Sequence, residues 1–198
     1  RWRSDDGRAE TVVVQGKPGQ AMRTLAQEDG DGPNIDAVLC ILAIAQELPH
    51  VHFLLVGGVC AYLQHFAYHL PPNVELAGVV DDETKNEILS WADLAINPME
   101  SGSGTNLKML DYMAAGVPVL STPFGARGLD LEDREHAWLA PLDEFPVVIP
   151  KIMDMSATTL KAMVRRARDH AVRLFAWEVV AEHLTSALSQ LCLARTQA

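Results

Sequence analysis

Residues 94–120 read LAINPMESGSGTNLKMLDYMAAGVPVL and contain one complete structural unit. The apolar run 94–98 predicts a short strand, and residues 100–104 predict a loop of small residues. Residues 105–115 predict a helix, and Gly116 follows it at the position where a left-handed residue commonly ends helices. The run 117–120 then predicts a second strand. This order of elements is typical of a βαβ unit with parallel strands.

The same alternation extends over most of the chain. The expected strands cover 11–14, 51–56, 74–80 and 137–139, and the expected helices cover 34–48, 61–69, 82–91 and, with a break near 175–177, 157–195. The strand residues 53–56 are continuously apolar, as happens when helices cover both faces of a sheet. We therefore predict an α/β fold, a Rossmann-like parallel sheet with helices on both faces. We expect an atypical or truncated N-terminal segment (1–32), a Rossmann-like domain (33–156) and C-terminal helices (157–198).

The composition is that of a globular protein and argues against nucleic acid as a partner. Of the 198 residues, 48% are hydrophobic and 21% are charged, and the net charge is -10. Proteins that bind a phosphate backbone usually carry a basic face or stripe. No apolar stretch reaches the roughly 18–20 residues that span a bilayer, and residues 1–10 lack the apolar core of a signal peptide. We expect a cytoplasmic protein, and peripheral contact with the inner face of a membrane stays open.

No group of side chains has the spacing of a metal site. Cys40 and Cys60 lie in apolar runs, which predicts buried, reduced thiols. His65 and His69 are four residues apart but lack a third ligand, so we expect the histidines to be surface or packing residues. The pair 81–82 is acidic, follows a strand and precedes a helix, which favours helix capping over metal binding.

The loop and helix start at 100–106 have features of an anion-binding turn. In parallel α/β sheets, ligands bind beyond the carboxyl ends of the strands. Gly102 and Gly104 permit tight turns, and Thr105 is a suitable helix N-cap. The free N–H groups of a helix start suit a diphosphate. The Gly-Lys-Ser/Thr ending of a P-loop is absent, and Leu107 stands where a dinucleotide-binding loop has its third glycine.

Asp111 is the candidate polar contact on this helix. We expect Leu107, Leu110 and Ala114 to form the buried face, with Asp111 at its border. A carboxylate at this position can accept hydrogen bonds from two hydroxyl groups, as a ribose diol offers. It can equally pair with Lys108 three residues earlier. Spacing alone leaves both interpretations open.

Four blocks of the sequence together resemble glycosyltransferase family 4. They are PNIDA at 33–37, PNVELAGVVDD at 72–82, GTNLKMLDYMAAGVPVLST at 104–122 and FAWE at 175–178. The resemblance implies a GT-B fold, in which two Rossmann-like domains face each other across a cleft. This chain is similar to the C-terminal domain, which holds the nucleotide-sugar donor, so residues 33–156 are expected to be a nucleotide-sugar-binding domain.

The resemblance also implies roles for particular residues. Asp111 takes the place of the second carboxylate in the family's Glu-x7-Glu pattern, which binds the ribose hydroxyls. The first carboxylate, which usually touches the sugar, falls on Ser103, and Glu100 lies close enough to substitute for it. Lys108 either neutralises diphosphate charge or is a solvated helix lysine. Lys17 is a weak match for a basic residue near the diphosphate. Backbone groups of Ser103, Gly104, Thr105 and Asn106 would face the diphosphate and sugar, and Gly78, Val79 and Val80 would border the base.

The implied activity is transfer of a sugar from a nucleotide diphosphate sugar to an acceptor hydroxyl, as a hexosyltransferase of glycan biosynthesis. It needs no cofactor or metal, because fixed dipoles and cations stabilise the leaving diphosphate. The acceptor is expected to be a glycan or a lipid-linked molecule. The base, the sugar, the acceptor and the stereochemical outcome stay open.

We expect this chain to be inactive alone, because the acceptor domain precedes the matching region in family members. That domain would come from the same or another chain. An apolar stripe on 177–193 predicts self-association or such a partner; it comprises Val179, Val180, Leu184, Leu188 and Leu191. The alternative function is a catalytically silent nucleotide-sugar-binding module or fragment.

Overall fold

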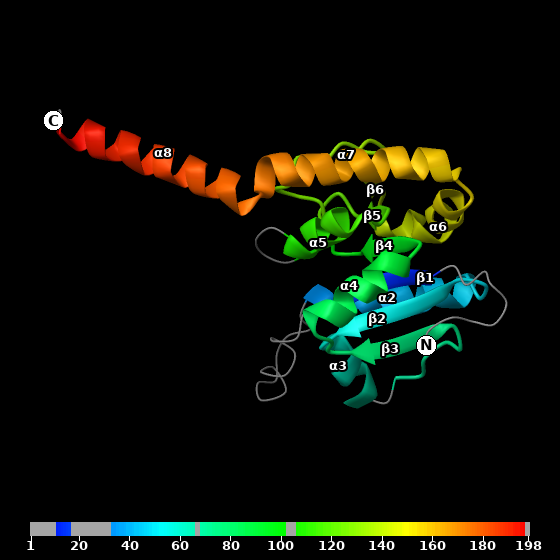
Figure 1. The fold of residues 1–198 in the computed structure, drawn as a ribbon. Helices are drawn as coiled ribbons and strands as arrows, with labels where there is room; N and C mark the ends of the chain where they lie inside the picture. Colours follow the sequence, from blue (N-terminus) through cyan, green and yellow to red (C-terminus); the bar gives the residue numbers. More distant parts are fainter. Residues whose placement is uncertain (1–10, 17–32, 66–67, 102–105, 197–198) are drawn as a thin grey trace.

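The computed structural model describes residues 11–16, 33–65, 68–101 and 106–196. In this part of the chain, six parallel strands form one sheet, which helices flank (Figure 1). The strand order is β3-β2-β1-β4-β5-β6, and every neighbouring pair is parallel. The strands are β1 (Thr11–Gly16), β2 (His52–Gly57), β3 (Val74–Gly78), β4 (Leu94–Asn97), β5 (Val119–Ser121) and β6 (Trp138–Leu139). The order reverses between β1 and β4, which is where ligands bind in doubly wound sheets.

Helices cover both faces of the sheet, which confirms the predicted fold class. Phe53 and Leu55 of β2 point into a core shared with α2, α3 and α6. Leu54 and Val56 point into the opposite core, shared with α4, α5 and α7. This alternation follows from the period of two residues in a strand. The helices are α2 (Pro33–Glu47), α3 (Val59–His65), α4 (Asp82–Trp91), α5 (Leu107–Ala115), α6 (Phe145–Met153), α7 (Ala157–Phe175) and α8 (Trp177–Thr196), and a 3-10 turn, η1 (Leu142–Glu144), precedes α6.

Two expectations about the N-terminal part of the chain need correction. Strand β1 lies between β2 and β4, so residues 11–16 belong to the same sheet as the domain that was expected to start at residue 33. The other expected domain boundaries, at residues 156 and 157, stay predictions. Cys40 is exposed, contrary to its predicted burial, because it lies on the outer side of α2. Cys60 is buried, donates to the carbonyl of Leu55 at 3.2 Å, and burial raises the pKa of its thiol.

Helix α8 continues from α7 but leaves the body of the domain (Figure 1). The extended backbone of Ala176, with ψ of 142°, separates the two helices. The apolar side chains that project from α8 are exposed: Trp177, Val180, Leu184 and Leu188. The side chain of Leu191 lies outside the described residues. None of the described helices combines the length and apolarity needed to cross a membrane.

Asn73, in the block at 72–82, joins β3 to the end of α2. Its Nδ2 donates to the carbonyls of Ala45 at 2.9 Å, Leu48 at 3.0 Å and Val51 at 2.8 Å. The side chain thus adds a donor to carbonyl groups at the end of α2 and in the turn that follows it, where the helix has no further N–H groups to offer.

Asn73→Ala is expected to lower the free energy of unfolding by about 1 kcal/mol, because these carbonyls lose a donor while keeping other contacts. Urea unfolding of both proteins measures the difference. Asn86→Ala, at an exposed position of α4, is the control and should change stability by less than about 0.5 kcal/mol. Equal losses in the two variants would contradict the capping role.

Candidate functional site

The carboxyl end of β3 leads directly into the capped start of α4. Gly78 has φ of +73° and open space where a side chain would stand, so it is conformation rather than crowding that requires glycine here. Val79 follows with 69% of its surface exposed, whereas Val80 packs partly against the core. Asp81 then caps α4 by accepting a hydrogen bond from the Thr84 N–H at 2.8 Å. This bond holds the pKa of Asp81 below its ordinary value and confirms the predicted capping.

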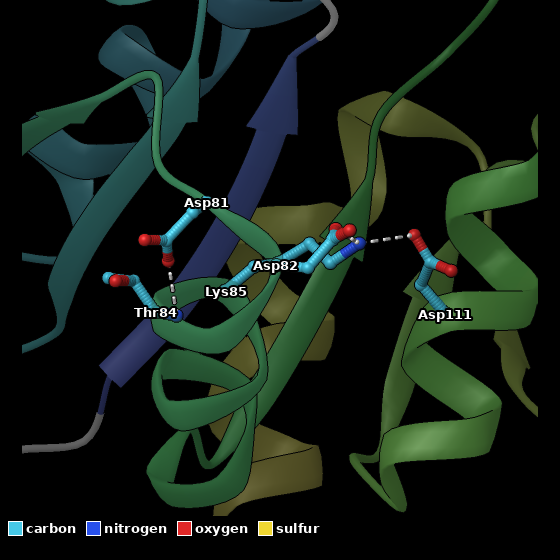
Figure 2. A network of polar contacts seen from close by, with 5 residues as sticks. All are labelled: Asp81, Asp82, Thr84, Lys85 and Asp111. Carbon is cyan, nitrogen blue, oxygen red and sulfur yellow. Dashed lines mark hydrogen bonds and ion pairs between the residues drawn. The ribbon is translucent and has the colours of Figure 1, made fainter.

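Asp111 of α5 faces Lys85 of α4 (Figure 2). The Lys85 Nζ lies 3.4 Å from Asp111 Oδ2 and 2.9 Å from Asp82 Oδ1. The Asp111 side chain is 45% exposed, that of Lys85 is 20% exposed and that of Asp82 is 91% exposed. The lysine is therefore enclosed between two carboxylates, and hydrogen bonding to Asp82 is the main cause that raises its pKa.

The buried face of α5 differs from the predicted one. Leu107 is 57% exposed, Leu110 is partly buried and Ala114 is exposed. The predicted residues have helical spacing, but so does a second set with bulkier side chains. This second set occupies the core against α7. The fully buried residues of α5 are Met109, Tyr112 and Met113. Lys108 is buried as well, at 7% exposure, so the solvated-lysine interpretation is wrong. Gly116 has φ of +78° and ends the helix as predicted.

The start of α5 also differs from the prediction. Asn106 is the N-cap in place of Thr105, and its side chain makes no capping hydrogen bond. Its Nδ2 donates instead to the carbonyl of Gly125 at 3.0 Å. Ser103, Gly104 and Thr105 lie outside the described residues, so their expected contacts stay predictions.

A buried polar network connects the ends of β4 and β5. Asn97 and Ser121 are register partners and both are fully buried. The Asn97 Nδ2 donates to Gly125 O at 3.0 Å and Ser121 Oγ at 3.3 Å. Thr122 Oγ1 accepts from the Gly125 N–H at 2.9 Å and donates to the Met99 carbonyl. The loops after β4 and β5 are therefore held together beneath the candidate site.

The sequence interpretation missed Lys85 and Asn97 as contributors to this region. A signal existed for Asn97, because it and Ser121 are polar residues that end otherwise apolar strands at the same sheet edge. No comparable local pattern marked Lys85. Within the described part of the chain, no cluster of three or more metal-ligating side chains occurs.

Two histidines join the segment after β5 to α7. His170 is buried, and its Nε2 donates to the Leu129 carbonyl at 2.8 Å. The His136 ring lies 4.4 Å from the His170 ring, and its Nδ1 accepts from the Glu132 N–H at 3.1 Å. These contacts fit the packing role expected for the histidines.

Stability is expected to fall as the pH drops below about 6.5, the ordinary pKa of histidine. Desolvation, followed by the charge of His170, lowers the pKa of His136 in the folded protein. The unfolded chain therefore binds the proton first as pH falls, and this favours unfolding. Melting curves between pH 7.5 and 5 should show a shallower loss for His136→Gln than for the unchanged protein. An equal loss of stability with falling pH in the two proteins would show that protonation of His136 is not the cause.

A doubly wound parallel sheet with helices on both faces defines the class of Rossmann-like α/β proteins. Within that class, the sequence pattern of Glycosyl transferases group 1 matches residues 32–154, more than half of the chain. The chain belongs to this family.

The phosphatidyl-myo-inositol mannosyltransferase of Mycobacterium tuberculosis is 28% identical over 188 residues, which cover 90% of this chain and 50% of that protein. The protein of the same name from Mycolicibacterium smegmatis is 24% identical over 181 residues, covering 89% and 47%. The chain thus spans about half the length of the curated relatives it matches.

Solved structures show the same fold. The sucrose-phosphate synthase of Thermosynechococcus elongatus has a TM-score of 0.69 at 20% identity, covering 93% of this chain and 46% of that one. The Anabaena protein HepE, in complex with UDP-glucose, has a TM-score of 0.66 at 17% identity, covering 93% and 50%. These likenesses confirm the α/β fold of this chain, which matches about half of each of these GT-B glycosyltransferase structures. The narrower assignment to family 4 stays a prediction.

Proposed function

We propose that this chain is the donor-binding half of a glycosyltransferase that moves a sugar from a nucleotide diphosphate sugar to an acceptor hydroxyl. The observation that carries the proposal is the Asp111 carboxylate, held by Lys85 at the carboxyl edge of the sheet. The names of the mannosyltransferase relatives and the UDP-glucose complex of HepE support it.

The nucleoside would occupy the space between the starts of α4 and α5. Asp111 would accept hydrogen bonds from the two ribose hydroxyls. The exposed side chain of Val79, with the Gly78 and Val80 backbone, would border the base. The base would then lie beside the end of β3 and the ribose beside α5, at the same edge of the sheet.

The diphosphate would lie at the start of α5. N–H groups at a helix start carry partial positive charge and favour anions. Backbone groups of Asn106, and of Ser103, Gly104 and Thr105 before it, would face the diphosphate and sugar. Lys108 is buried beneath this point, and its ammonium would add positive charge from within the domain. We propose no cofactor or metal for the reaction.

A separate acceptor-binding domain would complete the enzyme. The chain covers 50% of its mannosyltransferase relative, which fits a hexosyltransferase whose other half binds a glycan or lipid-linked acceptor. We propose a cytoplasmic location with peripheral membrane contact through the acceptor. The second candidate function, a catalytically silent nucleotide-sugar-binding module, would use the same donor site without that domain.

Self-association in the absence of this domain follows from the exposed stripe on α8, because Leu184 and Leu188 leave apolar surface in water. Light scattering should therefore detect species larger than a monomer. A Leu184→Ser/Leu188→Ser variant should shift the distribution toward monomer. A monodisperse monomer before any substitution would contradict this expectation.

Calorimetric titration with UDP-, GDP- and ADP-sugars tests the proposed function. Binding of one nucleotide class, with a Kd in the micromolar to millimolar range that is typical of enzyme substrates, would support the donor site and identify the base. A folded chain that binds none of them would overturn it. Adding an upstream acceptor domain and assaying sugar transfer would then separate the transferase from the silent module.

A further inference from the structure

We propose that Lys85 is a positioning residue for Asp111 and thereby sets the preference of the donor site for ribose over 2′-deoxyribose. This inference rests on the proposed function, because it assumes that Asp111 receives the nucleoside. It adds a residue from a second helix, α4, to the recognition of the sugar ring.

Two carboxylates contact the ammonium group of Lys85. Lys85 Nζ is 2.9 Å from Asp82 Oδ1 within its own helix and 3.4 Å from Asp111 Oδ2 on α5. The side chain of Lys85 is only 20% exposed, so most of its stem is covered and its freedom to swing away is limited. Its contact with Asp111 therefore ties a particular carboxylate oxygen to a nearly fixed point (Figure 2).

The other oxygen of Asp111 points away from Lys85 (Figure 2). An ionised carboxylate has about four acceptor positions on its two oxygens, so one contact to Lys85 leaves capacity for two hydroxyl donors. Without that contact the carboxylate of a half-exposed aspartate can rotate, because the terminal torsion of aspartate is soft. Lys85 thus holds the Asp111 carboxylate in one orientation before the ligand binds.

A fixed orientation affects ribose and 2′-deoxyribose differently. The two hydroxyls of a ribose diol can donate to the Asp111 carboxylate at once. The affinity for ribose therefore depends on how well the carboxylate is aligned with both hydroxyls. A 2′-deoxyribose offers one hydroxyl, which a rotating carboxylate can still meet. A site built to receive a hydroxyl also discriminates against the analogue that lacks it. Loss of Lys85 should therefore weaken ribose binding more than 2′-deoxyribose binding.

A purely structural role for Lys85 predicts a different result. An ion pair that only joined α4 to α5 would alter the melting temperature and would weaken both ligands by the same factor. The ratio of the two dissociation constants separates the roles, because a general loss of folded protein cancels in it.

The experiment measures the Kd of the best-binding nucleotide sugar and of its 2′-deoxy analogue for several variants. We expect Lys85→Met to weaken the ribose ligand about tenfold, the effect of one hydrogen bond to a charged group. The Kd of the 2′-deoxy ligand should change by less than about threefold, so the ratio of the two Kd values moves toward one. Lys85→Arg should retain most of the ratio, and Lys161→Met, at an exposed site on α7, should leave it unchanged.

Combination with Asp111→Ala makes the outcome decisive. If Lys85 acts through Asp111, adding Lys85→Met to Asp111→Ala changes neither Kd further. If Asp111→Ala weakens donor binding while Lys85→Met leaves the ribose preference intact, the inference is wrong and the proposed function stands. If no nucleotide sugar binds, or Asp111→Ala has no effect on binding, the proposed function fails and the inference fails with it.

Discussion

Gly125→Ala is expected to lower the free energy of unfolding by about 2–4 kcal/mol, from overpacking together with lost buried hydrogen bonds. A Cβ at this position would lie 2.6 Å from both Asn97 Nδ2 and Ser121 Oγ. Both side chains are fully buried, so neither can move aside without disturbing the β4 and β5 ends. Chemical denaturation of the purified variant measures the loss.

A double-mutant cycle identifies the cause of this loss. Asn97→Ala removes two of the three atoms nearest to the new Cβ, Asn97 Nδ2 and Cγ, so Gly125→Ala should cost less in that background. A change below about 0.5 kcal/mol for Gly125→Ala alone, the size expected of an ordinary surface substitution, would contradict the crowding seen around Gly125.

Asp111→Ala is expected to weaken binding of the nucleotide sugar by about 30- to 100-fold. Each hydrogen bond to a charged group contributes about 1.5–3 kcal/mol, and a ribose diol makes two that do not add fully. The Asp111 side chain is 45% exposed, so its loss should barely affect folding. Calorimetry measures the affinity, and melting curves confirm that the fold is intact.

Asp169→Ala provides the matched control for this prediction. It removes the same side chain from an exposed position on α7, so it changes net charge equally without touching the sheet edge. Equal affinity losses in the two variants would point to net charge as the cause and would remove Asp111 from the site.

Most of the fold could be predicted because its strands are short apolar runs separated by amphipathic helices. The exception is α6, which the sequence interpretation missed. Pro146 lies in its first turn, where a missing N–H costs little, but Pro150 stands inside the helix and argues against one. The helix forms because Phe145 and Ile149 are fully buried, a gain that only tertiary packing reveals.

The site was less predictable than the fold because its contacts join distant parts of the chain. Lys85 and Asp111 are separated by 26 positions, and Asn97 and Gly125 by 28. Asp111 was identified through the family resemblance, because spacing alone left its role open, and the predicted buried stripe of Leu107, Leu110 and Ala114 was wrong. The bulky side chains of Met109, Tyr112 and Met113 fill the core instead. As a result, Leu107 is exposed and Lys108 is buried.

The central claim is that a nucleotide sugar binds between the starts of α4 and α5. Hydrogen–deuterium exchange with and without the best-binding nucleotide sugar tests it most directly, since amides covered by ligand exchange more slowly. We predict protection in residues 78–85 and 106–112, with α8 unchanged. Protection confined to α7 and α8, with none at these two segments, would contradict the account.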